Sequence, residues 1–384
     1  MNTVVDLFAG CGGLSLGFQN AGFDVIAGFE YWDVAVECYK QNFTHPIYKS
    51  DLSDVKAATD QIKALAPDII IGGPPCQDFS QAGKRIEASR ASLTSAFAQI
   101  IINILPNFFV MENVDRAAHS ANYAYARSLF KEAGYGLTEI VLDACHCGVP
   151  QKRKRFFCLG SLNQPDNFLQ DYFIANISEK ETTLRDYFGN SLDFTYYYRH
   201  PRNYSRRAIF SIDEPAPTMR GMNRPVPKGY AGHPNDACPL NENIRALTTL
   251  ERSLIQTFPA DYRWVGNKTD TEQMIGNAVP VKLAEFVANA LKSHIDSLSN
   301  KGPLNLDTFK HWLDCKGKYT ARTISDILSR LKRADGILPI STPISTMYLF
   351  NLDNNPTFKT LSTTVKSQIR KAVNLYLNSV GIAI

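Results

Sequence analysis

The chain has 384 residues, of which 44% are hydrophobic and 20% charged, a composition typical of a soluble globular protein with two or three modules. Its apolar runs are short and interrupted by polar residues, which argues against a membrane-spanning segment, and the first residues lack a signal-peptide pattern. The eight cysteines include no Cys-x-x-Cys pair. We therefore expect free thiols in a cytoplasmic protein rather than disulfides or a zinc ribbon.

Charge is unevenly distributed along the chain. The net charge is +4, but residues 301–384 hold 12 Lys and Arg against 5 Asp and no Glu. The first 300 residues carry a small negative excess, with 29 basic against 32 acidic side chains. A basic tail on a weakly acidic body fits a polyanionic partner or a solvated tail, and charge alone favours neither.

Strand-like and helix-like runs alternate through the first 160 residues. The pattern predicts strands at 3–8, 24–30, 47–51, 68–73, 107–114 and 155–160, and helices at 33–43, 54–65, 92–105 and 122–133. The runs DIIIGG and NFFVMENV are too apolar for strands with one face exposed to solvent. The residue pattern alone therefore indicates a parallel sheet covered by helices.

The rest of the chain divides into three stretches. Residues 161–245 are rich in Tyr, Arg, Asn and Pro without clear periodicity, and residues 246–298 return to helical spacing. The run NKGP at 300–303 is typical of a linker. Helical apolar spacing then recurs at 306–313, 320–333 and 363–376, which predicts a helical, basic C-terminal extension over 299–384.

A glycine-rich turn, DLFAGCGGL at residues 6–14, follows the first predicted strand. Glycines at such a turn let a ligand approach the backbone, but Ser15 breaks the GxGxxG pattern of nicotinamide-cofactor proteins. Glu30 and Asp51 end the next two strands, where carboxylates can accept the hydroxyls of a ribose and the amino group of an adenine. Together these residues favour an adenosine-containing ligand.

Three further runs place reactive side chains at strand ends. Cys76 follows two prolines in GGPPCQDFS (72–80), a stiff turn that suits a nucleophile. Glu112 ends an apolar strand, where partial desolvation raises a carboxyl pKa and favours proton donation. Arg153 and Arg155 alternate within QKRKR (151–155), so they would point to the same face.

In this order, the runs resemble the motifs of DNA (cytosine-5)-methyltransferases of the bacterial restriction–modification type. RALTTLE (245–251) with QTFP (256–259), and then QMIGNAVP (273–280), resemble the last two motifs of that family. The resemblance covers about residues 3–295. It implies an α/β fold: a Rossmann-like mixed sheet of the AdoMet-dependent methyltransferases, with helices on both faces and a smaller irregular target-recognition domain.

The resemblance also implies how the chain divides and what it does. Residues 1–160 would form the catalytic, AdoMet-binding domain, residues 161–245 the target-recognition region, and residues 246–298 the return to the catalytic domain, ahead of the extension. The reaction would transfer a methyl group from S-adenosyl-L-methionine to C5 of a flipped-out cytosine in a specific duplex DNA sequence, through a covalent bond between Cys76 and C6. Glu112 would bind N3 and the amino group of the cytosine, and Arg155 its O2.

The remaining site residues come from the same motifs. Arg153 would act at the same site as Arg155 or on a flanking phosphate. The expected cofactor-binding residues are Phe8, Gly10, Gly12, Gly13, Leu14, Glu30, Tyr31, Asp51, Leu52, Gly73, Pro75, Leu93, Asn277 and Val279. The expected DNA-binding residues are Gln77, Ser80, Arg199, Arg202, Arg206, Arg207, Arg220 and Arg224, and which of these arginines read bases stays open.

The expected partner is duplex DNA, without metal or membrane, for a monomer that acts alongside a cognate restriction endonuclease. A tRNA cytosine-5 methyltransferase is the main alternative, although the Cys-Phe-Thr tripeptide of that family is missing. A non-catalytic DNA- or AdoMet-binding scaffold is a third. The helices of the tail faintly resemble the DNA-binding module of tyrosine recombinases, or they form a small bundle packed on the core.

Overall fold

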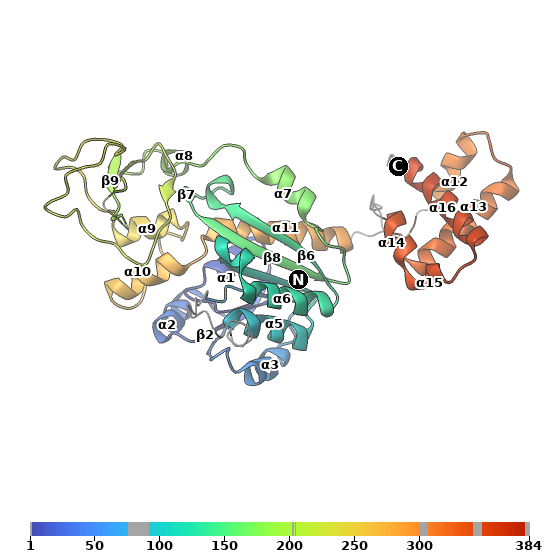
Figure 1. The fold of residues 1–384 in the computed structure, drawn as a ribbon, viewed down its shortest axis with the longest axis horizontal. Helices are drawn as coiled ribbons and strands as arrows, with labels where there is room; N and C mark the ends of the chain where they lie inside the picture. The colour runs from blue at the N-terminus through green and yellow to red at the C-terminus, as the bar shows by residue number, and fades with distance from the viewer. Residues whose placement is uncertain are drawn as a thin grey trace. The chain divides into compact units, whose positions relative to one another are not determined.

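The computed structural model describes residues 2–75, 92–201, 203, 205–299, 304, 306–340 and 348–380 (Figure 1). The chain forms two compact units, Met1–Lys292 and Ser293–Ile384, and the boundary falls within helix α11 (Val281–Ser299). No helix in the described ranges combines the length and the apolar character needed to cross a bilayer.

A seven-stranded mixed sheet forms the centre of the first unit, in the strand order β3-β2-β1-β4-β5-β8-β6. Neighbours from β3 to β5 are parallel, whereas β8 is antiparallel to both β5 and β6. The strands are β1 (Thr3–Leu7), β2 (Asp24–Glu30), β3 (Ile47–Lys49), β4 (Ile69–Gly72), β5 (Phe108–Val114), β6 (Tyr135–Asp143) and β8 (Lys154–Leu162).

The mixed sheet confirms the fold that the family resemblance implies and corrects the all-parallel arrangement that the residue pattern indicates. The connection from β6 to β8 is only residues 144–153, which is too short for the helical crossover that a parallel pair needs. β6 itself was not predicted. It is the last strand of the sheet, and Val141 on it is 45% exposed, so its apolar pattern is weaker than that of the central strands.

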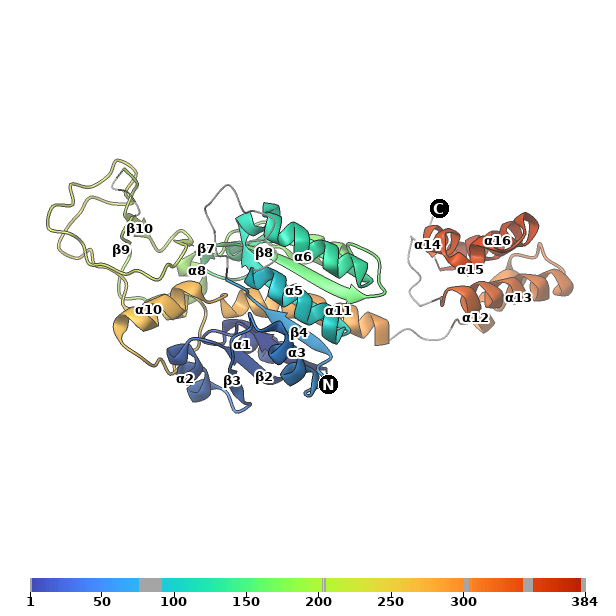
Figure 2. The ribbon, with the colours of Figure 1, turned by 60° about the horizontal axis from the view of Figure 1, so that its bottom comes forward.

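Helices cover both faces of this sheet. α3, α5 and α6 pack on one face through a core that includes Ile62, Phe97, Ile101 and Phe130, while Figure 2 shows α11 passing behind the sheet. Gly17 of α1 lies against α11, because a Cβ there would come 2.4 Å from the Cβ of Ala284. The helices introduced here are α1 (Gly13–Asn20), α2 (Asp33–Asn42), α3 (Val55–Lys63), α5 (Leu93–Ile104) and α6 (Ala121–Glu132).

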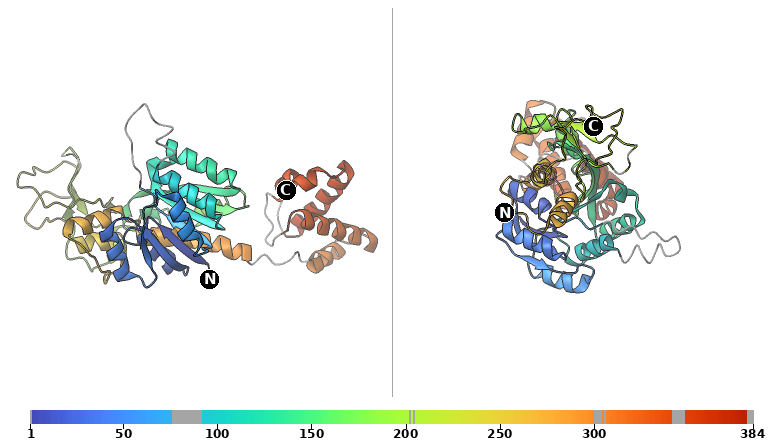
Figure 3. Two further views of the ribbon diagram at one scale, coloured as in Figure 1. Left: turned by 90° about the horizontal axis from the view of Figure 1, so that it is seen from below. Right: turned by 90° about the vertical axis from the view of Figure 1, so that its left-hand side faces the viewer.

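The region after β8 has little regular structure, as its sequence predicts (Figure 3). It holds a two-stranded antiparallel sheet and a small core that includes Leu184, Tyr197, Phe210 and Met219. β11 pairs with β7 and so joins this region to the sequence QKRKR. Its elements are β7 (Gln151–Lys152), α7 (Gln170–Asn176), α8 (Leu184–Phe188), β9 (Tyr196–Tyr198), β10 (Ile209–Ser211) and β11 (Ala216–Pro217), followed by α9 (Thr249–Ile255) and α10 (Lys268–Asn277).

The second unit is helical and has a hydrophobic core of its own. Phe309, Leu331, Leu352 and Tyr376 belong to this core, which draws on every helix of the unit beyond α11. The helices are α12 (Leu306–Cys315), α13 (Ala321–Ile337), α14 (Tyr348–Asn354), α15 (Pro356–Lys359) and α16 (Thr363–Ser379). The three longest of them confirm the predicted helical runs, whereas α14 and α15 are too short for a periodic signal.

Candidate active site

The carboxyl ends of β1, β2, β4 and β5 meet at one edge of the sheet, where a cavity of about 880 Å³ opens. The antiparallel strand β8 begins at the same edge, so its first residues also reach the cavity. Thirteen of the fourteen expected cofactor-binding residues line it: Phe8, Gly10, Gly13, Leu14, Glu30, Tyr31, Asp51, Leu52, Gly73, Pro75, Leu93, Asn277 and Val279.

Gly12 does not line the cavity and has a packing role instead. Its φ is +90°, and a Cβ there would come 2.3 Å from the ring of Phe43, so only glycine fits. A Cβ on Gly13 would meet the carbonyl oxygen of Val279 at 2.4 Å. This turn therefore lies directly against the last sequence motif, far away along the chain.

Glu30 ties the glycine turn to the end of β2. Its Oε2 accepts a hydrogen bond from Gly10 N at 2.8 Å, and its Oε1 accepts from the amides of Tyr31 (2.9 Å) and Trp32 (2.8 Å). A carboxylate has about four acceptor sites, and these amides take three, so Glu30 keeps about one for a ligand hydroxyl. Glu30 therefore both shapes the cavity and offers its wall a negative charge.

The far side of the cavity presents a carboxylate and aromatic rings. The side chain of Ser53, and then its backbone amide, donate to Asp51 and hold the pKa of Asp51 below its usual value, so the group is an ionised acceptor. Tyr31 is 65% exposed, which leaves its ring free to stack on a flat ligand. Trp32 also lines the cavity, and the sequence analysis did not single it out.

Glu112 and Arg155 form an ion pair inside the cavity. β5 and β8 pair antiparallel with Glu112 opposite Phe157, and Arg155 Nε lies 2.8 Å from Glu112 Oε1. The two side chains are only 11% and 13% exposed. Burial raises the pKa of Glu112, and Arg155 and then Arg153 act against that rise. Burial therefore favours the protonated form of this carboxyl, and the two arginines favour the charged form.

The segment that leads to Cys76 is fixed at the same edge. Asn113 donates from Nδ2 to the carbonyl of Pro74 at 3.0 Å, and Pro74 and Pro75 both line the cavity. Cys76, Gln77 and Ser80 lie outside the described residues. The backbone before Cys76 is thus held beside Glu112 by a buried amide.

Arg153 points away from the cavity, unlike Arg155. It is 1% exposed, and its guanidinium donates to the carbonyls of Met219 (2.9 Å), Gly276 (2.8 Å) and Ala278 (2.9 Å). These contacts join the break between β7 and β8 to the target region and to the last motif. The predicted strand alternation, which placed both arginines on one face, does not hold here, because residue 153 lies in the break between β7 and β8. Arg155 faces the cavity, whereas the buried guanidinium of Arg153 binds backbone carbonyls and does not reach a flanking phosphate.

The arginines expected to contact DNA fall into two groups. Arg199 and Arg220 bind carbonyls of Thr218 and His200, and Arg207 pairs with Glu214. Arg206 and Arg224 are exposed, and Arg202 lies outside the described residues. Burial, followed by the nearby Arg224, Arg220 and Arg199, lowers the pKa of His200, so three arginines converge on one point of this region.

Asp6 is a buried site residue that the sequence analysis did not identify. It lines the cavity and is fully buried, and Ser15 Oγ donates to its Oδ2 at 2.6 Å. The chain of contacts continues from Ser15 to Tyr39 OH (2.7 Å) and on to His45 Nε2 (2.7 Å). Burial raises the pKa of Asp6 to about 7. The position of Asp6, an acidic residue near the end of the first strand, is the sequence feature that could have identified it.

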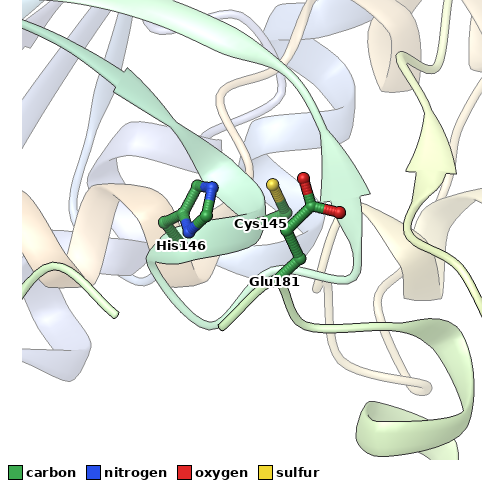
Figure 4. A group of neighbouring side chains, drawn as sticks. All are labelled: Cys145, His146 and Glu181. Atoms are coloured by element: carbon green, nitrogen blue, oxygen red, sulfur yellow. The ribbon is translucent and has the colours of Figure 1, made fainter. Parts of the chain in front are cut away.

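Cys145 and His146, on the loop between β6 and β8, lie beside Glu181 from the segment between α7 and α8 (Figure 4). Their ligand atoms lie within 4.8 Å of one another. However, His146 and Glu181 have partners in the protein, and the thiol of Cys145 stays protonated. His146 Nδ1 contacts the carbonyl of Ser178 at 2.7 Å, and Lys152 pairs with Glu181 at 2.8 Å. Burial raises the pKa of the Cys145 thiol to about 12. We assign this group a structural role.

Comparisons with known proteins agree with this geometry. The family model for C-5 cytosine-specific DNA methylase matches residues 2–293. The chain is 57% identical over 289 residues to the type II methyltransferase M.HindV of Haemophilus influenzae, covering 75% of this chain and 95% of that protein. It is 53% identical over 293 residues to the type II methyltransferase M.HgiDI of Herpetosiphon aurantiacus, covering 76% and 94%.

Solved structures share the fold at lower identity. A putative DNA modification methyltransferase from an Escherichia coli prophage has a TM-score of 0.56 and 21% identity, covering 77% of this chain and 100% of its own. The Schizosaccharomyces pombe Dnmt2 methyltransferase has a TM-score of 0.57 and 18% identity, covering 76% and 99%. The family match ends at residue 293, so the second unit lies outside it. The chain belongs to the C-5 cytosine-specific DNA methylase family.

Proposed function

We propose that this protein transfers a methyl group from S-adenosyl-L-methionine to C5 of a cytosine in a specific duplex DNA sequence, as the modification enzyme of a restriction–modification system. The observation that carries the proposal is the buried Glu112–Arg155 pair, at 2.8 Å, in the cavity that the glycine turn and Glu30 also line. The type II methyltransferases at 53–57% identity support the same reaction. We place the reaction in the cytoplasm, beside a cognate endonuclease.

The donor set of the cavity fits S-adenosyl-L-methionine. Glu30 would bind the ribose, Asp51 the adenine amino group, and Tyr31 the face of the adenine. Gly10 and Gly13 would let the methionine part approach the backbone, and Asn277 and Val279 would close the pocket from the last motif. The cofactor supplies an electrophilic methyl group on a positively charged sulfur.

Cytosine C5 is a weak nucleophile, and the residues of this chain would overcome that. The Cys76 thiolate adds to C6, which leaves the ring electron-rich at C5. Glu112 shares a proton with N3 and accepts from the amino group, and Arg155 donates to O2, so both offset the charge that develops on the ring. After methyl transfer, loss of the C5 proton expels Cys76 and restores the aromatic ring.

The positions of these groups require the target base to leave the helix. The Glu112–Arg155 pair is nearly buried, and a cytosine stacked in a duplex cannot reach it. Unstacking costs about a few kcal/mol, which contacts to the opened DNA must supply. Exposed Arg206 and Arg224 in the target region are candidates for those contacts.

Labelling with tritiated S-adenosyl-L-methionine tests the proposal. Incubation of the full chain with duplex DNA or with tRNA should label the DNA alone, and bisulfite sequencing of the product should locate one recurring cytosine. Label in tRNA alone would support the tRNA methyltransferase alternative. No label in either substrate, with intact cofactor binding, would support a non-catalytic scaffold.

A further inference from the structure

We propose that the second unit is a separate DNA-binding module, which grips the phosphate backbone beside the methylation site through one face of α13 and the turn before it. This inference rests on the proposed function, because it takes duplex DNA as the substrate of the first unit. The matched family ends at residue 293, so nothing in the family match assigns a role to this unit. The unit nevertheless has a complete core, and its surface is thus available for another role.

The positive charge of the unit is concentrated around α13. Residues 316–340 hold six Lys and Arg against two Asp. Lys316, Lys318, Arg322 and Arg333 are exposed, and we call these four residues the basic face. No acidic residue lies between Asp314 and Asp326, and this stretch holds three of these charges, Lys316, Lys318 and Arg322.

Helix geometry places Arg322 and Arg333 on one side of α13. They are eleven residues apart, which is three turns, or about 16 Å along the axis at 1.5 Å per residue. The opposite side of the helix carries Ile324, Ile327 and Leu331, all buried in the core of the unit. The two arginines are therefore directed away from the core, along the same line.

The unit does not neutralise these charges internally. Across residues 306–340 and 348–380, the structure has a single ion pair, Arg370 with Asp353, at 2.8 Å. The amide of Ile340 donates a hydrogen bond to Asp335, at 2.7 Å. Lys316 lies 4.8 Å from the centre of the Trp312 ring, a contact that holds the side chain without cancelling its charge. An excess of unpaired positive charge on one face fits a polyanion.

Duplex DNA is the polyanion that the proposed function assigns to the first unit of the same chain. The two units share one chain, so binding of DNA by the first raises the effective concentration of phosphates near the second. Lys and Arg contacts to phosphates add affinity without reading sequence, and they weaken as salt rises. The module should therefore increase affinity and leave the target sequence unchanged.

The test compares full-length proteins on two duplexes with the same target site, one just covering the site and one extended on both sides. The variant Lys318→Gln/Arg322→Gln/Arg333→Gln removes three charges from the basic face. The control Lys310→Gln/Lys359→Gln/Lys371→Gln removes three exposed charges from other helices of the unit. A second control, Lys318→Arg/Arg322→Lys/Arg333→Lys, keeps the charge.

Filter binding across a salt series gives the readout. The wild-type protein should bind the extended duplex more tightly than the short one. The basic-face variant should lose that advantage, and the slope of log affinity against log salt should fall by about 2–3, at ~0.9 per phosphate contact. Both controls should still bind the extended duplex more tightly than the short one, with most of the wild-type salt slope. All variants should have the same Tm as the wild type.

Two outcomes would overturn the module. Equal binding of both duplexes by the wild type would show that the second unit does not reach DNA. An equal loss in the first control would show that net charge, and not this face, is responsible. Single-turnover methylation of the short duplex at saturating concentration separates the two proposals: it should be unchanged in every variant, and its absence in the wild type would count against the proposed function instead.

Discussion

Arg155 Nε lies 2.8 Å from Glu112 Oε1 because β8 runs antiparallel to β5 and begins where β5 ends. Had β8 been parallel, its first residues would lie at the opposite edge of the sheet, away from the cavity. The reversal of one strand therefore brings together Glu112 and Arg155, the two residues that we propose bind the cytosine. Arg153, two residues earlier, is buried against backbone carbonyls and supports that arrangement from behind.

We expect Arg155→Met and Arg153→Met to separate chemistry from stability. Loss of Arg155 removes a donor to developing charge and should lower kcat about 10²–10³-fold, and Tm should fall less than in Arg153→Met because Glu112 can take up a proton when its partner is lost. Loss of Arg153 leaves three carbonyls without their donor and should cost about 3 kcal/mol or more of stability. Melting curves and single-turnover rates on the same preparations measure both. Similar losses of rate at unchanged Tm would instead place Arg153 at the substrate.

Glu30→Ala should weaken binding of S-adenosyl-L-methionine about 10- to 100-fold. The change removes charge-assisted hydrogen bonds worth ~1.5–3 kcal/mol to the ribose, and it frees the amides of Gly10, Tyr31 and Trp32. Glu30→Gln keeps one acceptor oxygen and should lose less. Isothermal titration calorimetry measures the affinity. An unchanged dissociation constant in Glu30→Ala would mean that the ribose lies elsewhere.

Asp6→Asn should change how stability depends on pH. Burial raises the pKa of Asp6 to about 7, so the folded state keeps a proton that the unfolded chain releases near pH 4. This contribution is complete below pH ~4 and is lost as the pH rises through 7. Asn does not titrate, so the variant should gain about 2–3 kcal/mol relative to the wild type between pH 5 and pH 8.

Melting temperatures of both proteins at pH 5 and pH 8 provide the measurement for Asp6. The Tm of Asp6→Asn minus the Tm of the wild type should be several degrees larger at pH 8 than at pH 5. Ser15→Ala is the matched control, because it removes the hydrogen bond to Asp6 and leaves the carboxyl in place. A constant difference at the two pH values would show that Asp6 does not titrate in this range.

Arg224→Ala and Arg207→Ala should differ in their effect on DNA binding. Arg224 is exposed, whereas Arg207 pairs with Glu214 and lies 4.2 Å from the centre of the Phe210 ring. We expect Arg224→Ala to weaken duplex binding at unchanged Tm, and Arg207→Ala to lower Tm first. Filter binding measures the affinity for the duplex, and melting curves measure Tm. Wild-type affinity in Arg224→Ala would show that Arg224 does not contact DNA.

Much of the cavity could be predicted because its residues sit at strand ends inside contiguous motifs. Glu30 and Glu112 follow strands whose apolar runs are plain in the sequence, and parallel strands bring such ends to one edge. The roles of Gly12 and Arg153 could not be predicted from the sequence. Their surroundings, the Phe43 ring and the Gly276 carbonyl, come from other parts of the chain, and no local pattern reports them.

The same distinction explains the rest of the fold. β6 is an edge strand whose apolar pattern is weak because part of it is exposed. α14 and α15 span only seven and four residues, too few for a clear helical periodicity. The antiparallel direction of β8 follows from the length of its connection to β6, which is visible only once β6 is known. Sequence alone therefore identified the elements of the centre better than those of the margins.

The covalent trap with duplex DNA that contains 5-fluorocytosine at the target tests the central claim most directly. Fluorine cannot leave as the C5 proton does, so a cysteine that has attacked C6 stays bound to the DNA. The wild-type protein with S-adenosyl-L-methionine should form an adduct that survives denaturation. Cys11→Ala should form it too, because burial raises the pKa of the Cys11 thiol well above its usual value and keeps it unreactive. Cys76→Ser should form none, and an adduct or continued methylation in that variant would contradict the mechanism.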